Sequence, residues 1–161
     1  DYHYHEQEYT EAAAAYDTFL ESFRRSDRAG YAMLQAARAT YASFHGVPYD
    51  PIPLLDARQR FEEFAEGYPE AARQANVDAI LERIEQTLAQ KDLETARFYG
   101  RTGRPEAELF YYRAVIREHP GTEAAQAARE ELRRRGEPAD IPAGADGESP
   151  AENERDAEDT P

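Results

Sequence analysis

The chain has 161 residues and a formal net charge of −14, and it contains no cysteine and no tryptophan. The absence of cysteine excludes disulfides, thiolate metal sites and a cysteine nucleophile. No apolar run reaches the about 18 residues that a membrane-spanning helix needs, and the excess of acidic residues argues against binding to nucleic-acid phosphates.

The N-terminal part of the chain predicts two helices after a short helical remnant. Residues 1–5 are typical of the end of a helix, so we expect this chain to be a mature form or a fragment, and residues 6–8 are expected to turn. The next predicted helix covers residues 9–23. Ser26 and Asp27 can cap a further helix that runs to about residue 44. Its inward stripe is expected to contain Tyr31, Leu34, Ala37 and Tyr41.

The middle of the chain predicts a break followed by two helices. Three prolines within residues 45–53 prevent the preceding helix from continuing. Residues 54–67 form a predicted helix that ends at Tyr68-Pro69. Residues 70–102 carry apolar residues at helical spacing, so they are expected to form one long helix.

The C-terminal part predicts two helices and a tail. After a turn at residues 100–105, a helix over 106–118 is ended by His119-Pro120-Gly121, and a last helix reaches about residue 135. Residues 137–161 are too rich in proline, glycine and acidic residues to bury enough surface for ordering. We therefore expect a repeat domain over 1–136 and a disordered acidic tail over 137–161. A solvated spacer is the first interpretation of that tail, and an acidic interaction segment is the alternative.

One aromatic spacing indicates the architecture. A small residue is followed at +4, +7 and +11 by aromatic residues, which places all four side chains on one face of a helix. The copies are Ala12, Tyr16, Phe19 and Phe23, then Ala57, Phe61, Phe64 and Tyr68 with Pro69, and an imperfect third copy with Glu108, Tyr112, Val115 and Pro120. In the third copy, either the helix rotates towards Ala107 or Glu108 lies at the edge of the contact. The spacing is typical of helix-turn-helix repeats, so we expect an all-α, tetratricopeptide-like solenoid.

The order of several short motifs resembles the BamD family over about residues 6–136. These motifs are Val47-Pro48-Tyr49-Asp50-Pro51, Ala57 with Phe61, Tyr68-Pro69, Ala96-Arg97-Phe98-Tyr99, Gly103, Tyr112-Arg113 and Pro120-Gly121-Thr122. The resemblance implies an all-α scaffold of the machinery that folds β-barrels into bacterial outer membranes. Such a scaffold is tethered by a lipid on an N-terminal cysteine, and its C-terminal repeats dock onto the periplasmic POTRA domains of the central barrel protein. Its N-terminal repeats are thought to meet unfolded clients.

The chain departs from the family pattern at three points. It has no lipid-accepting cysteine, Tyr111 stands where members often carry an arginine in the penultimate helix, and Phe23-Arg24 stands where a Tyr-Pro is expected. We therefore expect the anchor, and with it the first repeats, to lie outside this chain. The resemblance implies a periplasmic location at the inner face of the outer membrane.

Five aromatic residues flank the turn at 100–105, which is more than one helix face needs. Phe98, Tyr99 or Tyr112 can belong to a core, but consecutive residues diverge by about 100° on a helix. Phe110 and Tyr111 therefore cannot share one face. Packing against the preceding repeat or the terminal helix is the first interpretation, and Phe110, Tyr111 and the nearby Arg113 are the candidate partner interface.

No motif predicts catalysis, a metal or a cofactor. The sequence has no G-x-S-x-G, no glycine-rich phosphate loop and no His-Glu-x-x-His. His3 and His5 would point about 200° apart on a helix, and His119 is expected to pack before Pro120. We therefore expect a non-catalytic scaffold. The alternatives are a generic tetratricopeptide adaptor in the cell envelope or cytoplasm and an accessory helical domain of an enzyme.

Overall fold

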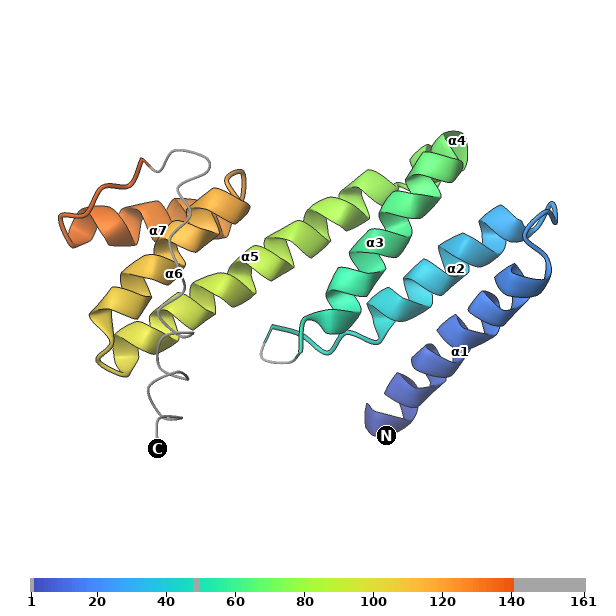
Figure 1. Ribbon diagram of the computed structural model, residues 1–161, viewed down its shortest axis with the longest axis horizontal. Coiled ribbons are helices and arrows are strands. Elements are labelled where there is room, and N and C mark those ends of the chain that lie inside the picture. Colours follow the sequence, from blue (N-terminus) through green and yellow to red (C-terminus); the bar gives the residue numbers. More distant parts are fainter. Residues whose placement is uncertain (1, 48–49, 141–161) are drawn as a thin grey trace, which may run out of the picture. The chain divides into compact units, whose positions relative to one another are not determined.

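The computed structural model describes residues 2–47 and 50–140, with side chains from residue 8 onward. Within these ranges the regular structure is helical and no strand occurs (Figure 1), which confirms the predicted all-α fold class. The helices are α1 (Tyr2–Ser22), α2 (Ala29–Ala42), α3 (Ile52–Gly67), α4 (Pro69–Gln74), α5 (Val77–Arg101), α6 (Pro105–Glu118) and α7 (Glu123–Arg134). None of these described helices is long and apolar enough to cross a membrane.

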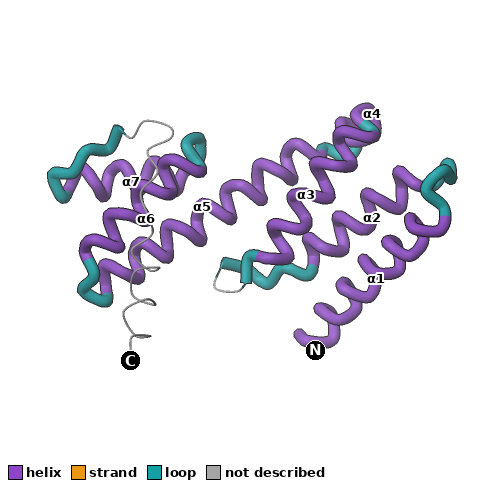
Figure 2. Tube along the Cα trace, viewed as in Figure 1, coloured by secondary structure: helices purple, strands orange, loops and turns teal. Residues whose placement is uncertain are grey.

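The chain divides into two compact units, and the boundary lies inside α5. Unit 1 covers Asp1–Ile84 and unit 2 covers Glu85–Pro161. In unit 1, α1 packs against α2 and α2 packs against α3, while in unit 2 α6 packs against α7. Within each unit, consecutive helices run up and down beside each other (Figure 2), as expected for helix-turn-helix repeats.

Helix α2 packs through alanines because it is covered on two sides. Its buried residues are Ala29, Ala32, Ala36, Ala37 and Ala39. Small side chains let the neighbouring helices α1 and α3 approach closely. The predicted inward stripe is wrong at Tyr31, which is 62% exposed.

Two predicted interruptions differ from the structure. Helix α1 is continuous from Tyr2 to Ser22, so the predicted turn at residues 6–8 is wrong. Glutamate and glutamine are good helix formers, and no glycine or proline stops the helix there. Residues 70–102 are not one helix, because Asn76 has a φ of 54° between α4 and α5. Asparagine tolerates this left-handed conformation better than most residues do.

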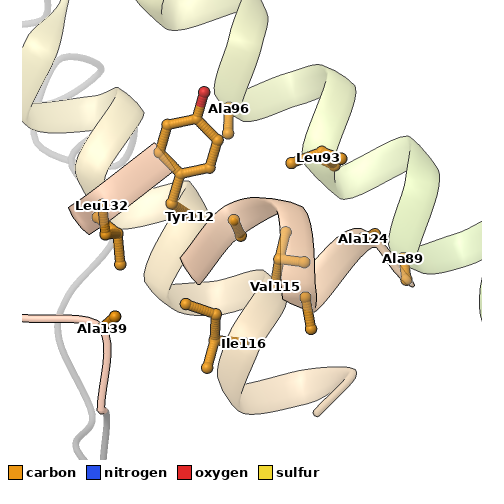
Figure 3. Close-up of a cluster of buried hydrophobic side chains, with 11 residues drawn as sticks. Ala89, Leu93, Ala96, Tyr112, Val115, Ile116, Ala124, Leu132 and Ala139 are labelled. Atoms are coloured by element: carbon orange, nitrogen blue, oxygen red, sulfur yellow. The ribbon is translucent and has the colours of Figure 1, made fainter. Parts of the chain in front are cut away.

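Unit 2 has one contiguous core, shown in Figure 3. It is built from Ala89, Leu93 and Ala96 of α5, Tyr112, Val115 and Ile116 of α6, Ala124, Ala125, Ala128 and Leu132 of α7, and Ala139. Three consecutive helices thus meet through one large aromatic residue, a few aliphatic residues and many alanines. This core supports the end of α5 and the whole of α6, on which the candidate interface lies.

The segment after α7 folds back onto unit 2. Gly136 has a φ of 74°, and the Gly136 and Glu137 amides donate to the carbonyl oxygens of Arg133 and Leu132, which is a glycine-based helix stop. Ala139 is buried in the core. The described start of the predicted tail, 137–140, therefore contacts unit 2. The remainder, 141–161, lies outside the described residues, and its disorder and spacer role stay predictions.

Candidate functional site

The turn between α5 and α6 positions the candidate interface. Gly103 has a φ of 75°, a left-handed conformation that glycine adopts without strain. Pro105 opens α6, where its missing N–H leaves no donor unpaired. The Arg104 amide donates to the Tyr99 carbonyl oxygen at 3.0 Å. The turn is therefore tight, and it brings the aromatic residues at the end of α5 beside those of α6.

Four side chains at this turn, Phe98, Tyr99, Phe110 and Tyr111, form what we call the aromatic cluster. Tyr99 and Tyr111 stack with ring centroids 5.0 Å apart and ring planes 5° apart. Phe98 meets Tyr99 edge-on at 5.6 Å, and Phe110 meets Tyr111 edge-on at 5.4 Å. Both geometries are favourable for aromatic pairs. The four rings of the cluster therefore contact one another across the turn.

The members of the aromatic cluster differ in exposure. Phe98 is 52% exposed, although the sequence allowed it as a core residue. Phe110 and Tyr111 are half-buried, and Tyr111 also packs against the core of unit 2. Arg113 is half-buried and pairs with Glu137 at 2.7 Å. The predicted interface residues thus lie on one helix, but Phe98 of α5 offers the most apolar surface to solvent.

A buried carboxylate lies between α5, α6 and the end of α7. Glu108 is 8% exposed, and Arg135 donates from Nη2 to its Oε1 at 2.6 Å. A Cβ on Gly100 would lie 2.4 Å from that oxygen, so the space for the carboxylate exists because α5 carries glycine there. Burial, and then the charge of Glu108, raise the pKa of Tyr112. The alternative that placed Glu108 at the edge of the contact is therefore wrong.

His119 ends α6 and joins it to α5 through polar contacts. It is 7% exposed, with Nδ1 2.7 Å from Glu85 Oε1 and Nε2 3.0 Å from Asp92 Oδ2. Carboxylates only accept hydrogen bonds, so the ring donates from both nitrogens as an imidazolium. The hydrogen bond to Asp92, opposed by burial and helped by Glu85, raises the pKa of His119 to about 8. His119 is buried as a packing residue would be, but its contacts are ionic.

The predicted repeat-packing residues fall into buried and exposed groups. The buried ones are Ala57, Phe61, Phe64 and Tyr112; the half-buried ones are Ala12, Tyr16 and Phe19, and the exposed ones are Tyr68, Pro69 and Pro120. In α1 the buried alanine is Ala13 rather than Ala12. Tyr68 is exposed on one face, but its ring lies against Gly30 of α2, where a Cβ would come within 2.9 Å.

Unit 1 contains a groove of about 560 Å³ with a mixed lining. Its walls include Leu20, Met33 and Tyr68 as well as Asp17 and Arg60. Arg60 donates to both carboxylate oxygens of Asp17, at 2.7 and 2.8 Å. These hydrogen bonds lower the pKa of Asp17. The ion pair links α1 to α3 at the edge of the groove.

Sequence reasoning missed the polar partners in unit 2. Glu85 and Asp92 are seven residues apart on α5, which places them on one helix face. This spacing could have indicated a pair of acidic side chains that face the same neighbour. Nothing local connects them to His119, because the paired residues are 34 and 27 positions apart. Glu108 and Arg135 are also 27 positions apart, so no local pattern in the sequence predicts their pairing.

The described residues define an all-helical protein of paired helices with an ordered, partly exposed aromatic surface. A family described as YfiO: Outer membrane lipoprotein matches residues 2–137. The chain belongs to this family, which confirms the expected resemblance at the level of an outer membrane lipoprotein family. No curated protein matches the chain.

Proposed function

We propose that this protein is a non-catalytic scaffold of the machinery that assembles β-barrel proteins in the outer membrane. The observation that carries the proposal is the match of an outer membrane lipoprotein family across residues 2–137. The scaffold acts at the periplasmic face of the membrane, and a lipid tethers it there. It works by holding partners together, so no catalytic step is part of the proposal.

The aromatic cluster is the proposed contact with the POTRA domains of the central barrel-insertion protein. Its stacked pair, Tyr99 and Tyr111, is already ordered, so little side-chain entropy is lost on binding. Exposed aromatic residues on a rigid support are the residues that most often dominate binding energy. Arg113 lies about 200° around α6 from Tyr111 and pairs with Glu137, so the proposed contact rests on the aromatic residues.

Unit 1 is the proposed contact for unfolded barrel proteins. The groove has apolar walls at Leu20 and Met33 and charged groups at Asp17 and Arg60. A barrel strand alternates apolar and polar side chains, so an extended segment of such a protein presents both kinds of group. The mixed lining of the groove suits a ligand of this chemistry.

The first experiment measures binding of the purified full chain to isolated POTRA domains by isothermal titration calorimetry. Phe98→Ala and Phe110→Ala should each weaken binding by about tenfold, with little change in melting temperature. Phe23→Ala is the matched control, because Phe23 is 58% exposed in unit 1. It should leave POTRA affinity unchanged.

Three other outcomes would count against parts of this proposal. An unchanged POTRA affinity in Phe98→Ala and Phe110→Ala would refute the aromatic cluster as the interface. A large loss of stability with unchanged affinity would assign the cluster to packing alone. Failure of the unmodified chain to bind POTRA domains would refute the scaffold role and favour the generic tetratricopeptide adaptor.

A further inference from the structure

The polar contacts around His119 are not used by the proposed scaffold function. We propose that His119, Asp92 and Glu118 of unit 2 form a binding site for a divalent transition-metal ion, with Zn²⁺ as the best fit. Each residue offers one ligand atom, and these atoms lie within 4.8 Å of one another. Two helices contribute, since Asp92 belongs to α5, while Glu118 ends α6 and His119 is the C-cap residue of α6.

The distances require only a small closure around the ion. Ligand atoms at about 2.0–2.2 Å from a tetrahedral Zn²⁺ lie about 3.3–3.5 Å apart. Asp92 Oδ2 and His119 Nε2 are already 3.0 Å apart. Glu118 is exposed at the end of α6, so its side chain can rotate inward by the remaining ångström or so. Water would fill the fourth position, as in other sites with three protein ligands.

The imidazole is held in the orientation that metal binding needs. Its Nδ1 lies 2.7 Å from Glu85 Oε1, and metal-binding histidines commonly donate their second N–H to a carboxylate in this way. This leaves Nε2, the nitrogen that faces Asp92, as the ligand atom. The backbone is fixed as well, because Thr122 Oγ1 donates to the His119 carbonyl oxygen at 2.8 Å. A buried, oriented imidazole distinguishes this cluster from an ordinary group of surface acids.

Charge and ligand type favour a transition metal. Three carboxylates, from Glu85, Asp92 and Glu118, lie around one imidazole, and Arg117 donates to Glu118 Oε1 at 2.9 Å. A dication that replaces the proton between Nε2 and Asp92 would be attracted by these carboxylates. One imidazole nitrogen with two carboxylate oxygens suits Zn²⁺ or Co²⁺ better than Ca²⁺ or Mg²⁺, which prefer oxygen ligands alone.

The test titrates zinc chloride into the full chain at neutral pH and measures binding by isothermal titration calorimetry. Glu118→Gln and Asp92→Asn should each lower the zinc affinity by about tenfold or more. Glu85→Gln should lower the zinc affinity by about tenfold because it removes the hydrogen bond that orients His119. Glu82→Gln, at an exposed glutamate of the same helix α5, is the control and should bind zinc as the unmodified chain does. Magnesium chloride should give no binding at this site.

Because the chain has three other histidines, the second measurement follows the His119 ring itself. The Nε2 resonance of His119, assigned by its loss in His119→Gln, should shift on addition of zinc chloride in proportion to occupancy. Glu118→Gln changes only an exposed side chain, so it should stay folded and keep the test decisive. Unchanged zinc affinity in Glu118→Gln and Asp92→Asn, or a His119 resonance that zinc does not move, would overturn the proposal.

Discussion

At the residue scale, Gly100 leaves the space that the carboxylate of Glu108 occupies. The glycine has no side chain, and the carboxylate of Glu108 fills the space that a Cβ would need. Arg135 then neutralises this buried charge through a 2.6 Å hydrogen bond, without which burial would be costly. The third repeat thus keeps its close helix contact although its own small residue is missing, because the neighbouring helix supplies one.

Gly100→Ala should therefore destabilise the protein by about 1–2 kcal/mol, although alanine is the better helix former by about 1 kcal/mol. The new methyl group forces the Glu108 carboxylate away from Arg135. In a Glu108→Ala background the same substitution should become neutral or stabilising, because only the gain in helix propensity remains. Urea denaturation of the four proteins of this cycle checks the change of sign. Equal effects of Gly100→Ala in both backgrounds would contradict the fitted contact.

At the scale of the helical elements, unit 1 combines close helix packing with one ion pair. Helix α2 contacts both α1 and α3 through its alanine face, while Asp17 of α1 and Arg60 of α3 pair across it. The alanines set how closely the helices approach. The ion pair adds a polar link at the edge of the groove.

This link should appear as an acid-dependent part of stability. Hydrogen bonds from Arg60 lower the pKa of Asp17 below its ordinary 3.8, so the pair stabilises the folded chain above pH 3.8 and the contribution is lost as the pH falls through the lower, folded-state pKa. Both side chains are about one-third exposed, which keeps the effect below about 1 kcal/mol. The free energies of unfolding of the unmodified chain and Asp17→Asn should therefore converge in acid. A difference that is independent of pH would rule this out.

The repeat register is tested on α3. Ala57 is fully buried there, so Ala57→Glu places a charge between packed helices and should cost more than about 3 kcal/mol, a large part of the stability that a folded domain has. Circular dichroism during thermal unfolding measures this loss. Ala79→Glu is the control, because Ala79 is exposed at a helical position of the same unit. An Ala57→Glu variant as stable as the control would show that the register is wrong.

Helix ends were predictable where glycine or proline marks them, and helix faces were less so. The end of α3 at Tyr68-Pro69 and the turn at Gly103 follow from local chemistry. The break at Asn76 was missed because asparagine only tolerates a left-handed conformation and does not require it. The face of α2 was misjudged at Tyr31, since an aromatic residue normally indicates the core but a helix with neighbours on two sides packs best with alanines.

At the scale of the whole molecule, the all-helical class and the family followed from spacing and motif order, whereas the contacts within unit 2 did not. Apolar periodicity reports which face of a helix is buried. It does not indicate which distant polar residue forms a hydrogen bond with a buried carboxylate or imidazole. The partners of Glu108 and His119 therefore required the three-dimensional arrangement.

The C-terminal boundary gives a prediction at this scale. Removal of residues 141–161 should leave the melting temperature unchanged if they act as the expected spacer. Removal of 137–161 should lower it by a few degrees, because the Arg113–Glu137 ion pair and the buried Ala139 are then lost as well. Differential scanning calorimetry of both truncated chains measures the shifts. Equal melting temperatures for the two would show that 137–140 add nothing to the fold.

The alanine face of α2 has a consequence for how the protein tolerates mutation. Shortening one of these alanines to glycine removes a single methyl group and costs about 1 kcal/mol of helix propensity, whereas every larger residue must push apart the helices on both sides. The core of unit 2 contains Leu93, Tyr112 and Leu132, where truncation leaves a cavity. A saturation scan should thus show opposite sensitivities at these two sets of positions: enlargement would be the damaging change at the alanines of α2, and truncation would be the damaging change at Leu93, Tyr112 and Leu132.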